Sequence, residues 1–299
     1  MTNSSTASEK SEIDALVEMI RANPFPEPLP EARAAMDSLG SPVSDGVKVE
    51  AIELGGVNCQ LLIPADADDD RVIMYLHGGG YLLGSLQSHA GLASEIGKSA
   101  SCRVLQVDYR LAPEHQFPAP IEDACKVYHA LLAGGTKSEK IILAGDSAGG
   151  GMVIACIASL KESGSALPGA AVCLSPWLDL KFTGESITSC KEVDPIIDTE
   201  VLSMMVSAYM GEQDPEQYKA SPLHADLQGF PPLLIQVGEC EILLSDSERL
   251  AEKAREAQLD LVYEKWPEMI HVWQLFYPHL TEARTAIAKI GEFIREKIN

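Results

Sequence analysis

Hydrophobic residues near the start of the chain recur every three or four positions, which is the spacing of an amphipathic helix. This pattern begins at Ser11 and ends at the proline-rich stretch 23–28. A second short helix is expected over residues 31–39, and the polar residues 1–10 predict a loose tail. Because both helices precede every expected strand, they must pack on another part of the molecule, and a lid over a binding site is one such place.

Beyond residue 45, short apolar runs alternate with helical segments. Residues 49–54 and 57–63 alternate in polarity on either side of Gly55-Gly56, which predicts a β-hairpin. Strands that alternate with helices indicate βαβ units and a mostly parallel sheet, so the pattern predicts an α/β fold. The further expected strands cover residues 72–76, 104–107, 141–144, 170–174, 233–237 and 261–263, and the expected helices cover 89–101, 121–132, 148–162, 247–257 and 281–297.

One segment, residues 187–218, interrupts this alternation. It falls between two expected strands and has no strand character of its own. A helix is expected within it over residues 199–209. We therefore expect a helical insertion that forms a second piece of the lid.

The length and charge of the chain narrow its possible functions. It has 299 residues, enough to bury one large core, and a formal net charge of −21. Such an acidic surface repels nucleic acid and anionic membranes, so neither is an expected partner, and solubility is the simplest interpretation of the charge. No apolar run reaches about 18 residues, so no integral membrane span is expected.

The first residues and the cysteines favour a cytoplasmic protein. The N-terminal segment is polar and acidic, unlike a secretory signal. The seven cysteines are scattered, and they form no C-x-x-C pair or other metal-binding spacing. Most of them lie in apolar runs, as core thiols do. We therefore expect a reducing compartment and no bound metal.

A glycine-rich turn follows the apolar run 141–144. Residues 145–149 read GDSAG, and a helical run comes next. A nucleophilic serine on a sharp strand-to-helix turn requires this order of elements. The flanking glycines let neighbouring backbone pass closely, and the helix N-terminus directs N–H groups at the reacting centre. We therefore interpret Ser147 as a candidate nucleophile rather than as part of an ordinary turn.

A second glycine-rich loop, HGGG at residues 77–80, follows the expected strand 72–76. A tetrahedral intermediate carries an oxyanion, and glycines expose backbone amides that bind it. Gly78 and Gly79, together with Ala148, are the expected donors. A phosphate-binding loop is disfavoured because no Lys-Ser/Thr pair follows. His77 is interpreted as structural, since the catalytic histidine comes last in chains with a nucleophile elbow.

Three motifs together resemble the hormone-sensitive-lipase-like family of α/β-hydrolase carboxylesterases. They are HGGG at residues 77–80, DYRLAPE at 108–114 and GDSAGG at 145–150. The resemblance implies an α/β-hydrolase fold, in which a mostly parallel sheet of about eight strands is flanked by helices and carries a helical cap. It also implies a Ser–acid–His triad that hydrolyses carboxylic esters with short acyl groups.

The resemblance also implies a division of the chain into domains. Residues 1–45 are expected to contribute N-terminal helices to the cap. Residues 46–299 are expected to form the catalytic domain, with the cap insertion around 185–220.

A serine nucleophile needs a base, and the base needs an orienting acid. The family places its acid shortly after a strand that ends in Val-Gly, which here is Val237-Gly238. The matching position is Glu241, where most members carry aspartate. Glutamate is an accepted third member of such triads and is one methylene longer. Glu239 and Asp246 stay open as alternatives.

The base is expected after the last strand. His271 lies in the segment 266–273, which resembles the catalytic-histidine loop of the family. A lone histidine among apolar residues is usually a core residue, but this position favours a base. His279, near the start of the expected final helix, is the alternative.

Four residues are expected to line the substrate pocket: Tyr81, Asp194, Met204 and Trp273. Tyr81, Met204 and Trp273 are candidates because a pocket for an acyl or alcohol group is mostly apolar. Asp194 begins the insertion as part of an Asp-Pro pair. For Asp194, capping of the helix 199–209 stays open as the other interpretation.

The chain is thus predicted to be a serine carboxylesterase with Ser147, Glu241 and His271 as its triad, and without a cofactor. A lactone hydrolase would use the same triad and stays open. A ligand-binding receptor of this fold is disfavoured, because such receptors lose the catalytic histidine and His271 is present. The expected partner is a small-molecule ester, and a homodimer through the edge strand 261–263 follows from the resemblance.

Overall fold

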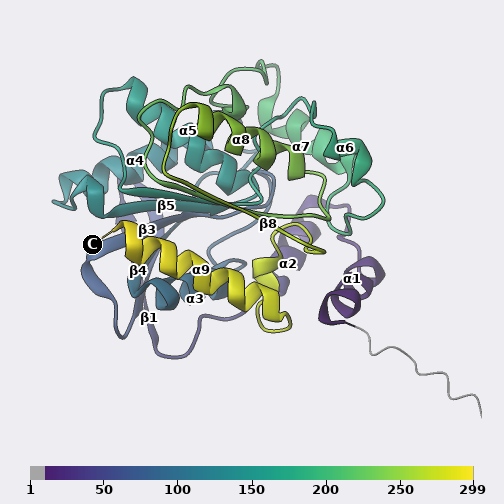
Figure 1. Ribbon diagram of the computed structural model, residues 1–299, viewed down its shortest axis with the longest axis horizontal. Coiled ribbons are helices and arrows are strands. Elements are labelled where there is room, and N and C mark those ends of the chain that lie inside the picture. The colour runs from purple at the N-terminus through teal and green to yellow at the C-terminus, as the bar shows by residue number, and fades with distance from the viewer. Residues whose placement is uncertain (1–10, 299) are drawn as a thin grey trace, which may run out of the picture.

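The computed structural model describes residues 11–298, and within this range the strands form one eight-stranded sheet (Figure 1). The expected tail at residues 1–10 lies outside the described residues. The strands are β1 (Val47–Leu54), β2 (Val57–Pro64), β3 (Asp68–Leu76), β4 (Cys102–Val107), β5 (Ile141–Asp146), β6 (Ala170–Leu174), β7 (Leu233–Gly238) and β8 (Leu261–Trp266). The helices are α1 (Glu12–Ala22), α2 (Leu29–Leu39), α3 (Ala90–Ala100), α4 (Ala119–Ala133), α5 (Ala148–Glu162), α6 (Ser186–Ser189), α7 (Thr199–Met210), α8 (Leu244–Glu256) and α9 (Thr281–Lys297), with short 3-10 helices η1 (Ser138–Lys140), η2 (Pro222–His224) and η3 (Trp273–Phe276).

The sheet is mostly parallel, as predicted. Its strand order is β1-β2-β4-β3-β5-β6-β7-β8. The β1–β2 hairpin and the β2–β4 pair are antiparallel, and all the other neighbouring strands run parallel. After β3 the chain turns to β4 on one side, whereas after β5 it continues to β6 on the other. The carboxyl ends of β3 and β5 therefore border the point at which the winding of the sheet reverses.

Helices cover both faces of the sheet. α4, α5 and α8 lie on one face, and α3 and α9 lie on the other (Figure 1). In β3, Ile73 and Tyr75 join the core beneath α3 and α9, whereas Val72 and Met74 join the core beneath α4 and α5. Successive side chains of a strand point to opposite faces, so a strand buried on both faces must be a continuous apolar run. This requirement explains why the apolar runs predicted the strands.

The remaining helices lie together at one end of the molecule. α1, α6 and α7 are on the right in Figure 1, with α2 beside them. Along the chain, α6 and α7 come after β6 and before β7, where the helical insertion is expected from the sequence. Among residues 11–298, none of the helices combines the length and the apolar character that a membrane crossing requires.

Element boundaries differ from the expected ones where polar residues extend a strand. β3 begins at Asp68 rather than at residue 72, because Asp68 pairs with Cys102 of β4 across a shift in register. β8 continues to Trp266, which pairs with Gly238 of β7. Backbone hydrogen bonds make these extensions, and the polarity of the side chains therefore gives no sign of them.

Candidate active site

Two loops lie side by side at the carboxyl ends of β3 and β5. Leu76, the last residue of β3, pairs with Gly145 of β5. The glycine-rich loop 77–80 continues from β3, and Ser147 follows β5. α/β sheets bind ligands outside the carboxyl ends of their strands where the winding reverses. Both candidate motifs therefore lie where a ligand site is expected.

Ser147 has a backbone conformation that L-residues rarely adopt, with φ 51° and ψ −121°. Its N–H donates to the carbonyl oxygen of Leu174 at 2.8 Å, and its own carbonyl accepts the N–H of Trp177 at 2.9 Å. The turn is tight, since a Cβ on Gly149 would overlap the carbonyl oxygen of Leu76. Ser147 therefore lies at the apex of a strand–turn–helix with the geometry of a nucleophile elbow.

Three side chains from different loops meet in one line of contacts. Ser147 Oγ lies 2.9 Å from His271 Nε2, although 124 residues separate the two in the chain. His271 Nδ1 lies 2.6 Å from Glu241 Oε2. Glu241 is fully buried, and His271 is only 5% exposed. The structure thus brings Ser147, His271 and Glu241 together in the order that a serine triad needs.

The alternative acids and the alternative base have other surroundings. Glu239 and His279 are exposed. Asp246 is buried, but it accepts the N–H of Leu178 at 2.8 Å and pairs with Arg249 at 2.7 Å. Burial raises the pKa of Asp246 to about 6, against the opposing effect of these two partners. Glu241 is the one of the three candidate acids that contacts His271.

Opposing effects act on the pKa of His271. Burial lowers this pKa, because the imidazolium loses its solvation. The Glu241 carboxylate raises it through charge and hydrogen bonding, and Asp194 and Asp146 raise it further. The result is a pKa above the ordinary 6.5 of histidine. This makes the imidazole a stronger acceptor for the proton of Ser147.

The glycine-rich loop differs from the expectation at Gly78. Its N–H donates to Asp146 Oδ1 at 3.1 Å, so this amide already has an acceptor within the protein. Gly79 has φ 114°, a conformation that favours glycine. Ala148 opens α5, where backbone N–H groups have no acceptor within the helix. Gly79 and Ala148 are therefore the better candidate donors, and Gly78 instead fixes the loop to Asp146.

A buried polar network beneath this loop includes residues that the sequence analysis missed. Asp146 Oδ1 accepts the hydroxyl of Tyr75 at 2.7 Å, and Asp146 Oδ2 lies 3.2 Å from His89 Nε2. Ser88 Oγ lies 2.8 Å from His89 Nδ1. Burial raises the pKa of Asp146, but His89 and the hydrogen bonds outweigh it and hold the pKa below its usual range. No local motif contains His89, and therefore a single sequence carries no signal for it.

His77 lies within the same network and has the environment of a structural residue. Its ring stacks on Tyr109 with the centroids 4.2 Å apart, and its Nδ1 lies 2.8 Å from the carbonyl oxygen of Gly78. Burial, together with the neighbouring His89, lowers the pKa of His77 to about 3. The imidazole is therefore neutral near pH 7 and packs against the loop as an uncharged group.

Two of the expected pocket residues are aromatic and buried. Tyr81 stacks on Tyr209 of α7 with the ring centroids 3.9 Å apart, so it joins the glycine-rich loop to the insertion. Trp273 is fully buried and packs against Trp266 with the centroids 5.5 Å apart. Trp273 thus lies in a core cluster with Trp266, and its place in the substrate pocket stays a prediction.

Met204, a further expected pocket residue, is 55% exposed. Its neighbour Met205 lies against the glycine-rich loop instead, since a Cβ on Gly80 would overlap Met205 Sδ. Successive side chains on a helix differ in direction by about 100°, so a shift of one residue changes the face. The residue of α7 that faces this loop is therefore Met205 rather than Met204.

Asp194 joins the insertion to the loop that carries Glu241. Its carboxylate accepts the N–H of Ile196 at 2.9 Å and the N–H of Ile242 at 2.9 Å. It does not cap α7, because Asp198 is the N-cap of that helix. Burial raises the pKa of Asp194. The side chain therefore fixes the backbone directly after Glu241.

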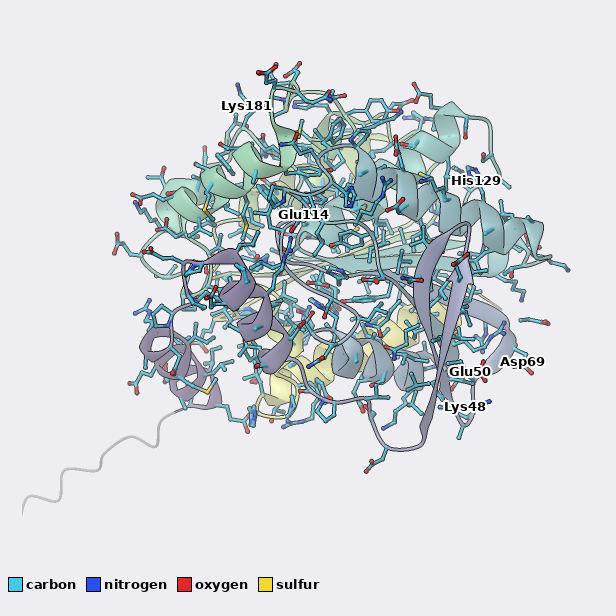
Figure 2. All side chains as sticks on the ribbon, turned by 180° about the vertical axis from the view of Figure 1, so that it is seen from behind. Lys48, Glu50, Asp69, Glu114, His129 and Lys181 are labelled. Carbon is cyan, nitrogen blue, oxygen red and sulfur yellow. The ribbon has the colours of Figure 1, made fainter. Side chains whose placement is uncertain are left out.

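Arg33 of α2 connects the N-terminal region to the loops around the site. Its guanidinium donates to the carbonyl oxygens of Leu82 and Ala112, both at 2.9 Å. It also forms a bidentate pair with Glu114, with both contacts at 2.8 Å. Glu114 is labelled in Figure 2, which shows it close to the N-terminal helices. Because Leu82 follows the glycine-rich loop almost directly, α2 is tied to that loop.

Known proteins resemble this chain over most of its length. A family model described as the alpha/beta hydrolase fold matches residues 73–275. An acetyl-hydrolase from Streptomyces hygroscopicus is 44% identical over 264 residues, which cover 88% of this chain and 86% of the relative. An esterase from Acinetobacter venetianus is 37% identical over 84% of this chain and 83% of that protein. Among solved structures, an esterase from the bacterial hormone-sensitive lipase family has a TM-score of 0.94 and 45% identity, and the match covers 98% of this chain and all of the other.

Proposed function

Because the chain belongs to the α/β-hydrolase family, we propose that it hydrolyses short-chain carboxylic esters with a triad of Ser147, His271 and Glu241. The observation that carries this proposal is the unbroken line of contacts from Ser147 Oγ through the imidazole to the Glu241 carboxylate. The relatives named acetyl-hydrolase and esterase support the same class of reaction.

The first half of the reaction forms an acyl-enzyme. His271 Nε2 accepts the proton of Ser147 Oγ as this oxygen attacks the ester carbonyl carbon. The carbonyl oxygen becomes an oxyanion, which binds the amides of Gly79 and Ala148 at the positive end of α5. Glu241 stabilises the protonated His271, which then gives its proton to the leaving alcohol. The acyl group stays on Ser147.

The second half of the reaction repeats these roles with water. His271 accepts a proton from a water molecule, whose oxygen attacks the acyl carbon. The same two amides bind the second oxyanion. As this intermediate collapses, His271 returns a proton to Ser147 Oγ and the carboxylic acid leaves. No step requires a group other than these side chains and amides.

We further propose that the N-terminal helices, within residues 11–45, and the insertion at 185–220 form a cap over the catalytic domain; residues 1–10 and 299 of the expected domains lie outside the described residues. The stack of Tyr81 on Tyr209 and the contact of Met205 with Gly80 place α7 against the glycine-rich loop. Arg33 holds α2 against the segment after the same loop. A covered site of this kind limits the length of the acyl group.

The acyl-chain preference tests this function directly. We expect kcat/KM for p-nitrophenyl esters to be highest between acetate and butyrate. We expect it to fall by at least about tenfold for palmitate, because methylenes that the pocket does not accept lose their binding energy. A preference for palmitate would contradict the short-chain proposal. If the folded protein hydrolysed none of the esters, the whole function would be wrong, and a panel of lactones would be measured next.

The pH dependence follows from the raised pKa of His271. The imidazole must be neutral to accept a proton, so kcat/KM falls as the pH drops through this pKa. Because the pKa lies above the ordinary 6.5, we expect the midpoint of the acidic limb above pH 6.5. Hydrolysis of p-nitrophenyl acetate between about pH 5 and about pH 9 at constant ionic strength measures this midpoint. A midpoint at lower pH would show that Glu241 does not outweigh burial.

A further inference from the structure

Ser175 is a fully buried serine that the reaction described above does not use. It directly follows β6, which lies between β5, the strand before the nucleophile, and β7, the strand before the acid. Its N–H donates to the carbonyl oxygen of Gln236 in β7 at 2.7 Å. Its φ of 44° lies in the left-handed region, which non-glycine residues occupy at a cost in free energy. Such strain persists where the surroundings hold the residue firmly, and it is common near functional sites.

The hydroxyl of Ser175 joins the two loops that carry Glu241 and His271. Ser175 Oγ donates to Glu241 Oε1 at 2.7 Å. The same oxygen accepts the N–H of Val272, the residue after His271, at 3.1 Å. A hydroxyl is both a donor and an acceptor, so it makes these two contacts at once. An apolar side chain of the same size makes neither.

The two carboxylate oxygens of Glu241 have separate partners. Oε1 accepts the hydroxyl of Ser175 and also the N–H of Gly238, the latter at 2.6 Å. Oε2 faces His271 Nδ1 at 2.6 Å. Glutamate has one more side-chain torsion than aspartate, and the torsion that turns its carboxylate has only broad preferences. Two donors on Oε1 therefore fix the rotation that presents Oε2 to the imidazole.

We propose that Ser175 is a positioning residue for ester hydrolysis, which acts by holding the Glu241 carboxylate against His271. The inference rests on the proposed role of Glu241 in the triad. The hydrogen bond is charge-assisted, because its acceptor is a carboxylate, and such bonds are stronger than neutral ones. The contact with Val272 also holds the loop of His271 at a fixed distance from the acid.

Ser175→Ala removes the hydroxyl and keeps the Cβ. We expect kcat for p-nitrophenyl acetate to fall by about 10- to 100-fold with nearly unchanged KM, because a hydrogen bond to a charged group is lost and no contact to the substrate is removed. The acidic limb of kcat/KM is expected to move to lower pH, because a rotated carboxylate raises the pKa of His271 less. A purely structural serine would not move this limb.

Two further variants separate the hydroxyl from the backbone and from general packing. Ser175→Gly also lacks the hydroxyl but accepts the left-handed backbone without strain, so it is expected to lose as much kcat as Ser175→Ala. Ser247→Ala is the matched control, because Ser247 is fully buried and its hydroxyl has no hydrogen-bond partner within residues 11–298. Wild-type kcat and an unshifted acidic limb are expected for this control.

Combination with Glu241→Ala tests whether Ser175 acts through the acid. In that background we expect Ser175→Ala to change kcat by less than about twofold, because residues that act as one unit have non-additive effects. An effect as large as in the wild type would overturn the proposal. So would wild-type kcat in Ser175→Ala, or a loss of kcat in Ser175→Ala that Ser175→Gly does not share. If Ser175→Ala does not fold, Ser175→Gly supplies the same measurements.

The failure of this inference is distinguishable from the failure of the proposed function. Full activity in Glu241→Ala would overturn the triad itself. A large loss in Glu241→Ala together with full activity in Ser175→Ala would overturn only the role of Ser175.

Discussion

Ser147→Ala is expected to lower kcat for ester hydrolysis by about 10⁵- to 10⁶-fold, because the variant has no oxygen that can form the acyl-enzyme. The remaining activity comes from binding and from the amides of Gly79 and Ala148, which still stabilise an oxyanion when water attacks directly. KM is expected to change little. Alanine keeps the Cβ, so the unusual backbone at φ 51° is no more strained than before and the fold is retained.

The measurement combines kinetics with covalent labelling. Hydrolysis of p-nitrophenyl acetate is compared between wild type, Ser147→Ala and the buried control Ser247→Ala, with thermal denaturation as the test of folding. A fluorophosphonate probe is expected to add one label to the wild type and to the control, and none to Ser147→Ala. If the folded variant retained more than about 1% of wild-type kcat, Ser147 would not be the nucleophile.

Glu241→Gln is expected to lower kcat by about 10³- to 10⁴-fold, the size of effect known for an amide in place of a triad carboxylate. Glutamine has nearly the same shape, but it offers no negative charge to a protonated His271. Its amide oxygen accepts from Gly238 and Ser175, which both donate to this side chain now, and its NH2 group then faces His271 Nδ1 and favours the wrong tautomer of the imidazole. The acidic limb of kcat/KM is expected to move to lower pH, because the carboxylate that raises the pKa of His271 is gone.

Two related variants make this second prediction specific. Glu241→Asp keeps the charge but withdraws it by one methylene, so we expect a smaller loss of about 10- to 100-fold. Glu239→Gln removes an exposed carboxylate close by in the chain and is expected to retain wild-type kcat. A large loss in Glu239→Gln with little loss in Glu241→Gln would mean that the acid has been assigned to the wrong residue.

The strands were predictable because this sheet is covered on both faces. The segment 141–144 is fully buried, so each of its side chains must be apolar, and the run stands out in the sequence. The strand order is a different matter, because β4 lies between β2 and β3 through pairings that no local pattern encodes. The polar start of β3 at Asp68 is not predictable for the same reason, since backbone groups alone make that pairing.

The residues of the site also differ in whether the sequence predicts them. Ser147 and His271 were identifiable because each lies in a motif whose position relative to a strand has chemical meaning. The contact of His89 with Asp146 spans 57 residues, and the contact of Ser175 with Glu241 spans 66. Neither separation follows a helix or strand period or forms part of a motif in this sequence. Only the folded chain brings such side chains together, so a single sequence does not show them.

The helix that follows the nucleophile and the first helix of the chain differ in how deeply they are buried. α5, which begins next to Ser147, is buried along most of its length, whereas α1 buries only Ile13 and Leu16. Local opening has a free energy near zero for weakly packed ends and approaches that of global unfolding for central elements. α1 therefore exchanges between docked and open states far more often than the elbow at Ser147 loosens. On the proposal that the N-terminal helices form part of the cap, heating toward the melting temperature is expected to widen access to the site before Ser147 loosens.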